Sequence, residues 1–86
     1  MDYLVEWEPI AVKDMRSLPR NVQEKVGEHL DKLAHGFQGD VIKMKGEKDR
    51  YRLRVGRYRI LFKLEGNRVV VYRIRTRGDA YLKFVW

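Results

Sequence analysis

The sequence predicts an α+β fold in which an N-terminal strand and a helix hairpin pack on one face of a twisted antiparallel sheet. Apolar residues recur at helical spacing as far as residue 37, and from residue 41 onward they recur with a period of two. Glycine-containing turn signals divide the later part of the chain into strand-length segments. Because a chain of 86 residues has room for one hydrophobic core, we expect residues 1–86 to form a single domain.

The first half of the chain carries the strand and the helices. Residues 2–8 are expected to form a strand because their apolar and polar side chains alternate. Residues 10–18 have the spacing of a short helix, and Pro19 suits the first position of a second helix. The second helix is expected to bury one apolar stripe, which consists of Val22, Val26, Leu30, Leu33 and Phe37. Gly36 is expected at its C-terminal end.

The second half is expected to form four strands, at residues 41–44, 51–55, 58–64 and 69–75. Between the second and third of these, Gly56 and Arg57 predict a two-residue hairpin loop, in which Gly56 supplies the positive φ of a type II′ turn. This loop places Arg54 opposite Arg59. The apolar side chains of the hairpin then face the helices, whereas Arg52, Arg54 and Arg59 face away from them.

The following turn determines the register of the last strand. A two-residue loop at Gly66-Asn67 would place Ile60 opposite Arg73 and mix apolar with charged side chains on one face. A three-residue loop at residues 66–68 instead aligns Ile60 with Ile74 and Phe62 with Tyr72. We therefore expect the three-residue loop, because a slip of one residue exchanges the two faces of a strand. Arg73 and Arg75 would then join the basic face.

The charge of the chain is concentrated in the second half. Residues 1–49 carry eight Lys/Arg and ten Asp/Glu, whereas residues 50–86 carry eleven and two. Nine of those eleven cations are arginine, whose planar guanidinium matches phosphate oxygens. Facing arginines destabilise a sheet, so such a cluster indicates an anionic ligand. Two simpler interpretations remain open: a solvated surface that aids solubility, or neutralisation by carboxylates such as those of Glu47 and Asp49.

Several functional classes are excluded by what the sequence lacks. There is no cysteine for a disulfide or a thiolate site, and His29 and His35 are too far apart around a helix to share a metal ion. No apolar run is long enough to span a membrane, and the first residues do not resemble a signal peptide. No phosphate-binding glycine loop or Ser/His/Asp arrangement is evident. We therefore expect a cytoplasmic protein without a metal, a cofactor or a membrane contact.

Three segments together resemble the RelE toxins of type II toxin–antitoxin systems, and the last is most similar to the archaeal branch. They are VIKMKG at residues 41–46, YRLRVGRYRILF at residues 51–62 and RGDAY at residues 77–81. The middle segment is shared with the ParE-type gyrase inhibitors. The four-residue spacing from Arg77 to Tyr81 is the feature that favours RelE. The resemblance extends over nearly the whole chain and implies the RelE-like microbial ribonuclease fold.

What the resemblance implies is a toxin that enters the ribosomal A site, cuts mRNA there and is silenced by a RelB-like antitoxin. The positions that match the family's active site are Lys45, Arg52, Arg54, Arg59, Arg77 and Tyr81. We expect Lys43, Arg57, Arg73 and Arg75 to contact RNA around them. Family members often have lysine at the positions of Arg52 and Arg54. Arginine keeps the charge there but stays protonated, so it is a poor proton acceptor.

The expected reaction is attack of a ribose 2′-hydroxyl on the adjacent phosphorus, in which arginines neutralise the charge of the phosphorane. Lys45 is the better base, since lysine pKa values fall readily beside other cations. Tyr81 could stack on a base, donate a proton to the leaving oxygen, or anchor the end of the chain to the sheet. The alternatives to the mRNA endonuclease are a ParE-like, non-enzymatic gyrase inhibitor and an inactive RNA-binding relative.

Overall fold

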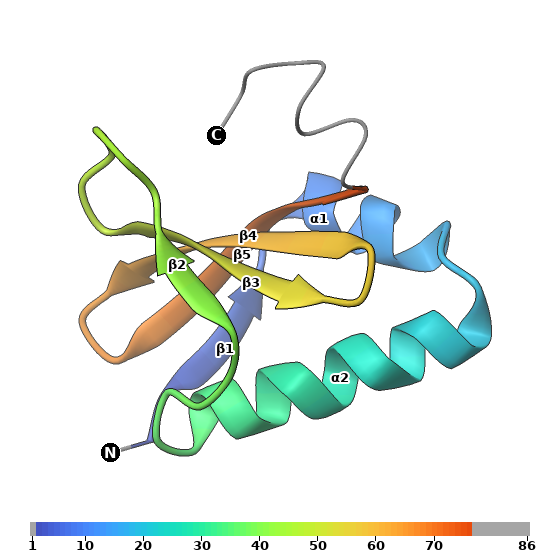
Figure 1. Ribbon diagram of the computed structural model, residues 1–86, viewed down its shortest axis with the longest axis horizontal. Coiled ribbons are helices and arrows are strands. Elements are labelled where there is room, and N and C mark those ends of the chain that lie inside the picture. Colours follow the sequence, from blue (N-terminus) through green and yellow to red (C-terminus); the bar gives the residue numbers. More distant parts are fainter. Residues whose placement is uncertain (1, 77–86) are drawn as a thin grey trace.

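The computed structural model of the protein describes residues 2–76, which form a five-stranded sheet with two helices (Figure 1). In chain order the elements are β1 (Leu4–Trp7), α1 (Pro9–Arg16), α2 (Arg20–Ala34), β2 (Val41–Lys43), β3 (Arg50–Val55), β4 (Tyr58–Glu65) and β5 (Arg68–Thr76). The predicted α+β fold is confirmed, and each predicted element is present within a few residues of its expected bounds.

The sheet is mixed, with the strand order β1-β5-β4-β3-β2. Strands β2 to β5 are antiparallel, as expected, but β1 pairs in parallel with β5, with Val5 opposite Val69 and Trp7 opposite Val71. The N-terminal strand is therefore an edge strand of the sheet and does not lie on its face. The physical reason is that two parallel strands must be joined by a long connection, and the helices begin such a connection between β1 and β5.

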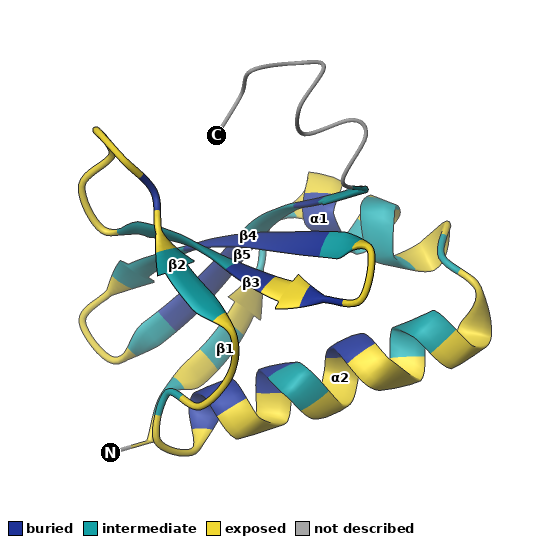
Figure 2. Cartoon of the chain, in the orientation of Figure 1, coloured by how far each residue is buried: buried dark blue, intermediate teal, exposed yellow. Residues whose placement is uncertain are grey.

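Both helices contribute to one hydrophobic core on one face of the sheet. α1 packs on β5, and α2 packs on β1 and β3 (Figure 1). Figure 2 shows that α2 is buried along the side that faces the sheet, where Val26, Leu30 and Leu33 lie, and exposed along its outer side. Gln23 ties the helices together, because its side-chain amide donates to the carbonyls of Met15 and Leu18. Within residues 2–76, neither helix is long and apolar enough to cross a membrane.

The hairpin between β3 and β4 has the predicted register. Val55 pairs with Tyr58, Arg54 with Arg59 and Leu53 with Ile60 across the two-residue loop. Gly56 has a φ of +60°, whereas Arg57 does not have a positive φ, which agrees with a type II′ turn. Leu53 and Ile60 are fully buried against the helices. The predicted separation of apolar and basic faces in this hairpin is confirmed.

The prediction for the next turn was wrong. Glu65 pairs with Arg68, so the loop has the two residues Gly66 and Asn67. Phe62 pairs with Val71, and the register then shifts between Leu61 and Phe62, so that Tyr72 is an extra residue on β5. This β-bulge restores the predicted pairing of Ile60 with Ile74 and keeps apolar residues on the core face. A two-residue turn followed by a bulge therefore gives the same pairing of Ile60 with Ile74 that the three-residue loop was expected to give.

Candidate functional site

Three arginines lie side by side on the second face of the sheet, which is the face opposite the helices. Arg54 on β3 pairs with Arg59 on β4, and Arg59 pairs with Arg75 on β5. We call these three residues the arginine row. Like charges at directly opposed positions repel one another, so the row costs stability unless an anion or a carboxylate lies near it. The row was predicted from the hairpin register and from the parity of β5.

Two members of the arginine row are held in place by nearby oxygen atoms. The Nε of Arg54 lies 2.9 Å from Oδ2 of Asp40 in an exposed ion pair. Arg59 is only 5% exposed, and its Nη1 donates to the carbonyls of Gly56 and Tyr58 at 3.4 and 3.2 Å. These carbonyls belong to the β3–β4 turn, so the turn itself orients the Arg59 guanidinium.

The third member, Arg75, has a buried Nε without a hydrogen-bond partner in the described part of the chain. A buried guanidinium nitrogen without an acceptor is unfavourable, and an anionic oxygen would remove that cost. The arginine row therefore combines one guanidinium fixed by backbone carbonyls, one paired with a carboxylate and one with an unsatisfied donor.

A small hollow opens beside the row at the edge of the sheet. Its volume is about 280 Å³, and it is lined by Ile42, Lys43, Met44, Lys45 and Arg52. Arg52 is half-buried and pairs with Leu61 on β4, while Lys45 is exposed in the loop after β2. The structure thus brings Lys43, Lys45 and Arg52 together, on the same edge of the sheet as Arg54.

Arg73 lies apart from this group because α1 binds it. Its Nε donates to Oδ2 of Asp14 at 2.9 Å, and the same oxygen accepts the backbone N–H of Ile74 at 2.9 Å. Asp14 therefore accepts a backbone N–H of β5 beyond the point where the pairing with β1 ends. The Arg73 guanidinium, predicted to contact RNA, takes part in this helix–sheet contact.

The carboxylates that reach Arg73 and Arg54 are those of Asp14 and Asp40, and not those of Glu47 or Asp49, neither of which forms an ion pair within residues 2–76. A sequence signal for Asp40 existed: Val41 pairs with Leu53, so the preceding residue lies beside Arg54. No local signal pointed to Asp14, because 59 positions separate it from Arg73.

Arg50 and Tyr72 form a second contact that the sequence analysis missed. The Arg50 guanidinium carbon lies over the Tyr72 ring, 4.6 Å from its centroid. A hydrogen bond with Tyr72, together with the carboxylates of Glu47 and Glu8, raises the pKa of Arg50, against the opposing effect of burial. Arg50 therefore remains a permanent cation on the second face.

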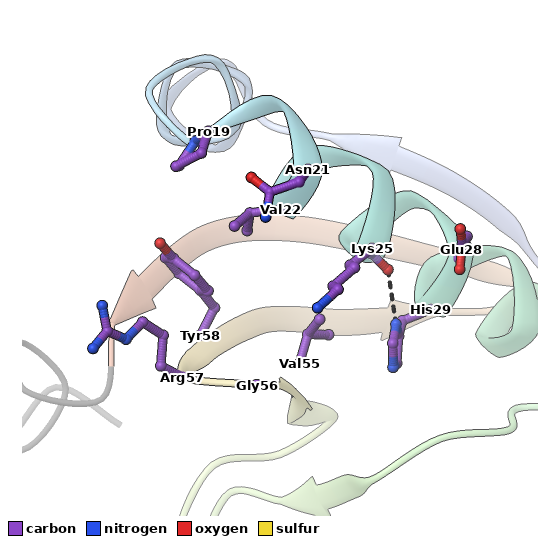
Figure 3. Close-up of a pocket in the computed structure, with 10 residues that line it drawn as sticks. All are labelled: Pro19, Asn21, Val22, Lys25, Glu28, His29, Val55, Gly56, Arg57 and Tyr58. Atoms are coloured by element: carbon purple, nitrogen blue, oxygen red, sulfur yellow. Dashed lines mark hydrogen bonds between the residues drawn. The ribbon is translucent and has the colours of Figure 1, made fainter.

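Arg57 lies at the other side of the β3–β4 turn and lines a groove between the hairpin and α2 (Figure 3). The groove has a volume of about 610 Å³. Its apolar lining comes from Pro19, Val22, Val55 and Tyr58, and its charged lining from Lys25, Glu28 and Arg57, with His29 beside them. Figure 3 shows the side chains of α2 on one side of the groove and Tyr58 and Arg57 on the other. Arg57 is thus separated from the hollow that Lys45 and Arg52 line.

Two of the predicted site residues, Arg77 and Tyr81, lie outside the described residues. Within residues 2–76, no group of three or more His, Asp or Glu side chains is placed to hold a metal ion. Besides the carboxylate of Asp40, the second face presents guanidinium, ammonium and phenol groups. These groups bind and neutralise phosphate oxygens.

Known proteins of similar sequence and structure share this arrangement of elements. A family model described as the ParE toxin of the type II toxin–antitoxin system parDE matches residues 5–81. Toxin RelE3 of Methanocaldococcus jannaschii is 27% identical over 75 residues, which make up 81% of this chain and 85% of the relative.

Two solved complexes contain chains with the same fold. The archaeal RelE–RelB complex from Pyrococcus horikoshii OT3 matches with a TM-score of 0.77 and 30% identity, over 93% of this chain and 100% of that chain. The RelB–RelE antitoxin–toxin complex from Methanococcus jannaschii matches with a TM-score of 0.79 and 24% identity, over 92% and 98%. With the family model covering most of its length, the chain belongs to the RelE/ParE family of type II toxin–antitoxin toxins.

Proposed function

We propose that this toxin is a ribosome-dependent mRNA endonuclease, which acts in the cytoplasm and is silenced by a RelB-like antitoxin. The observation that carries the proposal is the arginine row on the second face, with Arg52 and Lys45 beside it. A protein that only needs solubility has no use for registered arginines that repel one another. A phosphodiester entering this face would bring negative charge to Arg59 and Arg75, which form no ion pair within residues 2–76.

The reaction that fits these groups is an intramolecular transesterification of the RNA. A ribose 2′-oxygen attacks the adjacent phosphorus, the bond to the 5′-oxygen breaks, and the products are a 2′,3′-cyclic phosphate and a free 5′-hydroxyl. Arg54, Arg59 and Arg52 would neutralise the extra negative charge of the phosphorane, and each well-placed donor of this kind contributes roughly 10²- to 10³-fold. Arg59 is suited to this because the turn carbonyls already orient it.

Proton transfer is assigned to residues other than these arginines, because arginine keeps its proton. Lys45 is the proposed base that accepts the 2′-hydroxyl proton, and Tyr81 is the proposed donor to the leaving 5′-oxygen. Arg77 would add a further positive charge to the phosphate. Lys43, Arg57, Arg73 and Arg75 are proposed to contact the RNA backbone. Of this last group, Arg73 must share its guanidinium with Asp14 to do so.

Dependence on the ribosome follows from what the site can supply. The hollow beside the arginine row is small, with a volume of about 280 Å³, so it cannot by itself force a flexible RNA into in-line geometry. Orientation of the reacting groups is worth ~7 kcal/mol or more. A ribosome that holds the message in a fixed conformation would provide that orientation, and the toxin would provide charge and proton carriers.

The antitoxin is proposed to use the groove between α2 and the β3–β4 hairpin (Figure 3). The groove combines apolar side chains with two cations, Lys25 and Arg57, and one carboxylate, Glu28, so it suits a segment with apolar side chains on one side and carboxylates at its margin. The solved relatives described above are complexes of a toxin with an antitoxin, which favours such a partner here.

The test is primer extension on one labelled message, with and without ribosomes, at a fixed salt concentration. We expect rapid cleavage on programmed ribosomes and slow or no cleavage of free RNA. Arg54→Ala should abolish cleavage, whereas Lys13→Ala, which removes an exposed cation from α1, should leave it unchanged. Equal rates with and without ribosomes would overturn the proposed mechanism.

A second function is favoured by one observation, namely that the matching family model is described as a ParE toxin. A ParE-like chain would inhibit gyrase without cutting RNA. A supercoiling assay with purified gyrase distinguishes the two functions. Inhibition of gyrase, combined with an intact message on translating ribosomes, would identify the ParE-like activity.

A further inference from the structure

On the second face, the Arg50 guanidinium contacts the Tyr72 ring, and no other cation described above makes a contact of this kind. The Arg50 guanidinium lies over the Tyr72 ring at 4.6 Å, and the Tyr72 hydroxyl donates to the sulfur of Met44 at 3.5 Å. Met44 is buried, while Arg50 and Tyr72 are half-buried. The three side chains come from three separate parts of the chain: the residue directly after β2, the start of β3 and the middle of β5.

The β-bulge explains why Tyr72 reaches this position. Phe62 pairs with Val71 and Leu61 with Arg73, so Tyr72 has no partner of its own in the register. A bulge leaves its extra residue outside the ladder and re-aims the side chain. The ring therefore extends across β4 toward Arg50, which pairs with Lys63 on the far side of that strand.

Arg50 is also distinguished by what holds it. Arg54, Arg68 and Arg73 each form an ion pair with a carboxylate. Within residues 2–76, Arg50 has no carboxylate within ion-pair distance, and its neighbour is an aromatic ring instead. A guanidinium fixed over a ring presents a flat cationic surface, and such surfaces stack on unpaired nucleobases.

We propose that Arg50 and Tyr72 form a stacking platform for one unpaired nucleobase of the RNA, next to the phosphate bound by Lys45 and Arg52. The hollow that Lys45 and Arg52 line includes Met44, whose sulfur accepts the Tyr72 hydroxyl, so the platform and the hollow share this residue. The base stacks on the outer side of the Arg50 guanidinium, and the attached phosphate enters the hollow. Arg50 and Tyr72 are thus positioning residues, and this role rests on the proposed function.

The platform is tested by the binding of short single-stranded RNAs in which one abasic position is moved along the chain. Binding is measured by fluorescence anisotropy at low salt. For the unmodified protein, we expect an abasic site at one position to weaken binding roughly tenfold, the size of a single base–aromatic stack. At the other positions the effect should be much smaller.

Two variants separate stacking from charge. We call the one position at which an abasic site weakens binding the special position. Arg50→Lys keeps the charge but loses the flat surface, so the special position should disappear while the dependence of binding on salt stays the same. Tyr72→Leu should have the same effect because it releases Arg50. Arg68→Lys is the matched control, since Arg68 lies on β5, the strand of Tyr72, but is bound to Glu6 and Glu65. This control should keep the special position.

Each outcome decides one of the two proposals. A special position that persists in Arg50→Lys and Tyr72→Leu overturns the platform, and so does a wild-type protein that binds every abasic RNA equally or binds none. Cleavage of mRNA on ribosomes is measured separately with the wild-type chain. If that cleavage is absent while the special position is present, the endonuclease fails and the platform stands.

Discussion

Oδ2 of Asp40 lies 2.9 Å from Nε of Arg54, so a carboxylate of the toxin itself occupies one side of a guanidinium in the arginine row. The backbone reinforces this contact, because the N–H of Arg54 donates to the carbonyl of Asp40 at 3.0 Å. Both side chains are about half exposed. A phosphate that approaches Arg54 must therefore compete with Asp40.

The first prediction is that Asp40→Asn increases the affinity for single-stranded RNA by up to about fivefold, which corresponds to the upper range for an exposed ion pair. The free energy of unfolding should change little, because an exposed pair contributes little to stability. Anisotropy at fixed salt measures the affinity. Asp31→Asn, an exposed change on α2, is the control and should leave binding unaltered. Unchanged or weaker binding by Asp40→Asn would show that this carboxylate does not compete with RNA.

The second prediction concerns toxicity. Arg54→Ala and Arg59→Ala should each abolish growth arrest, because each removes a cation from the arginine row. Arg54→Ala should leave the unfolding free energy within about 0.5 kcal/mol of wild type, as is usual for exposed side chains. Growth after induction and urea denaturation of the purified variants provide the two measurements. Undiminished arrest in both variants would remove these residues from the active site.

The third prediction concerns Asp14, which is mostly buried and holds both Arg73 and the N–H of Ile74. Asp14→Ala should lower the free energy of unfolding by about 2–3 kcal/mol, since hydrogen bonds to charged groups contribute about 1.5–3 kcal/mol. Asp14→Asn should lower it less, because its amide oxygen still accepts the N–H of Ile74. Urea denaturation gives both values. Equal stability of all three proteins would mean that α1 is held by its apolar contacts alone.

The fourth prediction concerns pH. His35 donates from Nδ1 to the Asp31 carbonyl at 2.7 Å, and this bond, together with the Asp31 carboxylate, raises the pKa of His35 above 6.5. A raised folded-state pKa adds stability that is fully present below pH 6.5 and is lost as the pH rises through the folded value. NMR titration should show a pKa above 6.5 for His35, and Asp31→Asn should lower it. An unshifted titration of His35 would contradict the assignment.

The fifth prediction tests the groove between α2 and the hairpin. Lys25→Glu should slow association with the antitoxin several-fold and weaken the dependence of that rate on salt, because a positive charge at the margin of the groove steers an acidic partner. Lys32→Glu makes the same change on the same helix outside the groove and should have a smaller effect. Surface plasmon resonance gives the rates. If both variants behave alike, only the net charge matters and the groove is not the docking site.

The β3–β4 hairpin could be predicted residue by residue because its information is local. Gly56 defines the turn, and the alternation of side chains on both strands agrees with one register only. The same reasoning failed at Gly66 because a bulge leaves no signature in the turn. Tyr72, its extra residue, resembles any other strand residue in the sequence.

The site was predictable to the extent that it depends on strand parity. Arg54, Arg59 and Arg75 follow from pairing, so the arginine row was expected. The contacts of Arg73 with Asp14 and of Arg50 with Tyr72 depend on how distant elements approach in space. No spacing within the sequence encodes such an approach.

The parallel pairing of β1 with β5 has a consequence for how the toxin is made. Leu4 and Val5 pair with Arg68 and Val69, so β1 can complete its pairing only after β5 has been synthesised. Contacts between such distant positions close late and slow the folding of a domain. The arginine row also needs β5, because Arg75 completes it. A nascent chain therefore cannot contain the complete arginine row until β5 has been synthesised and has paired with β4.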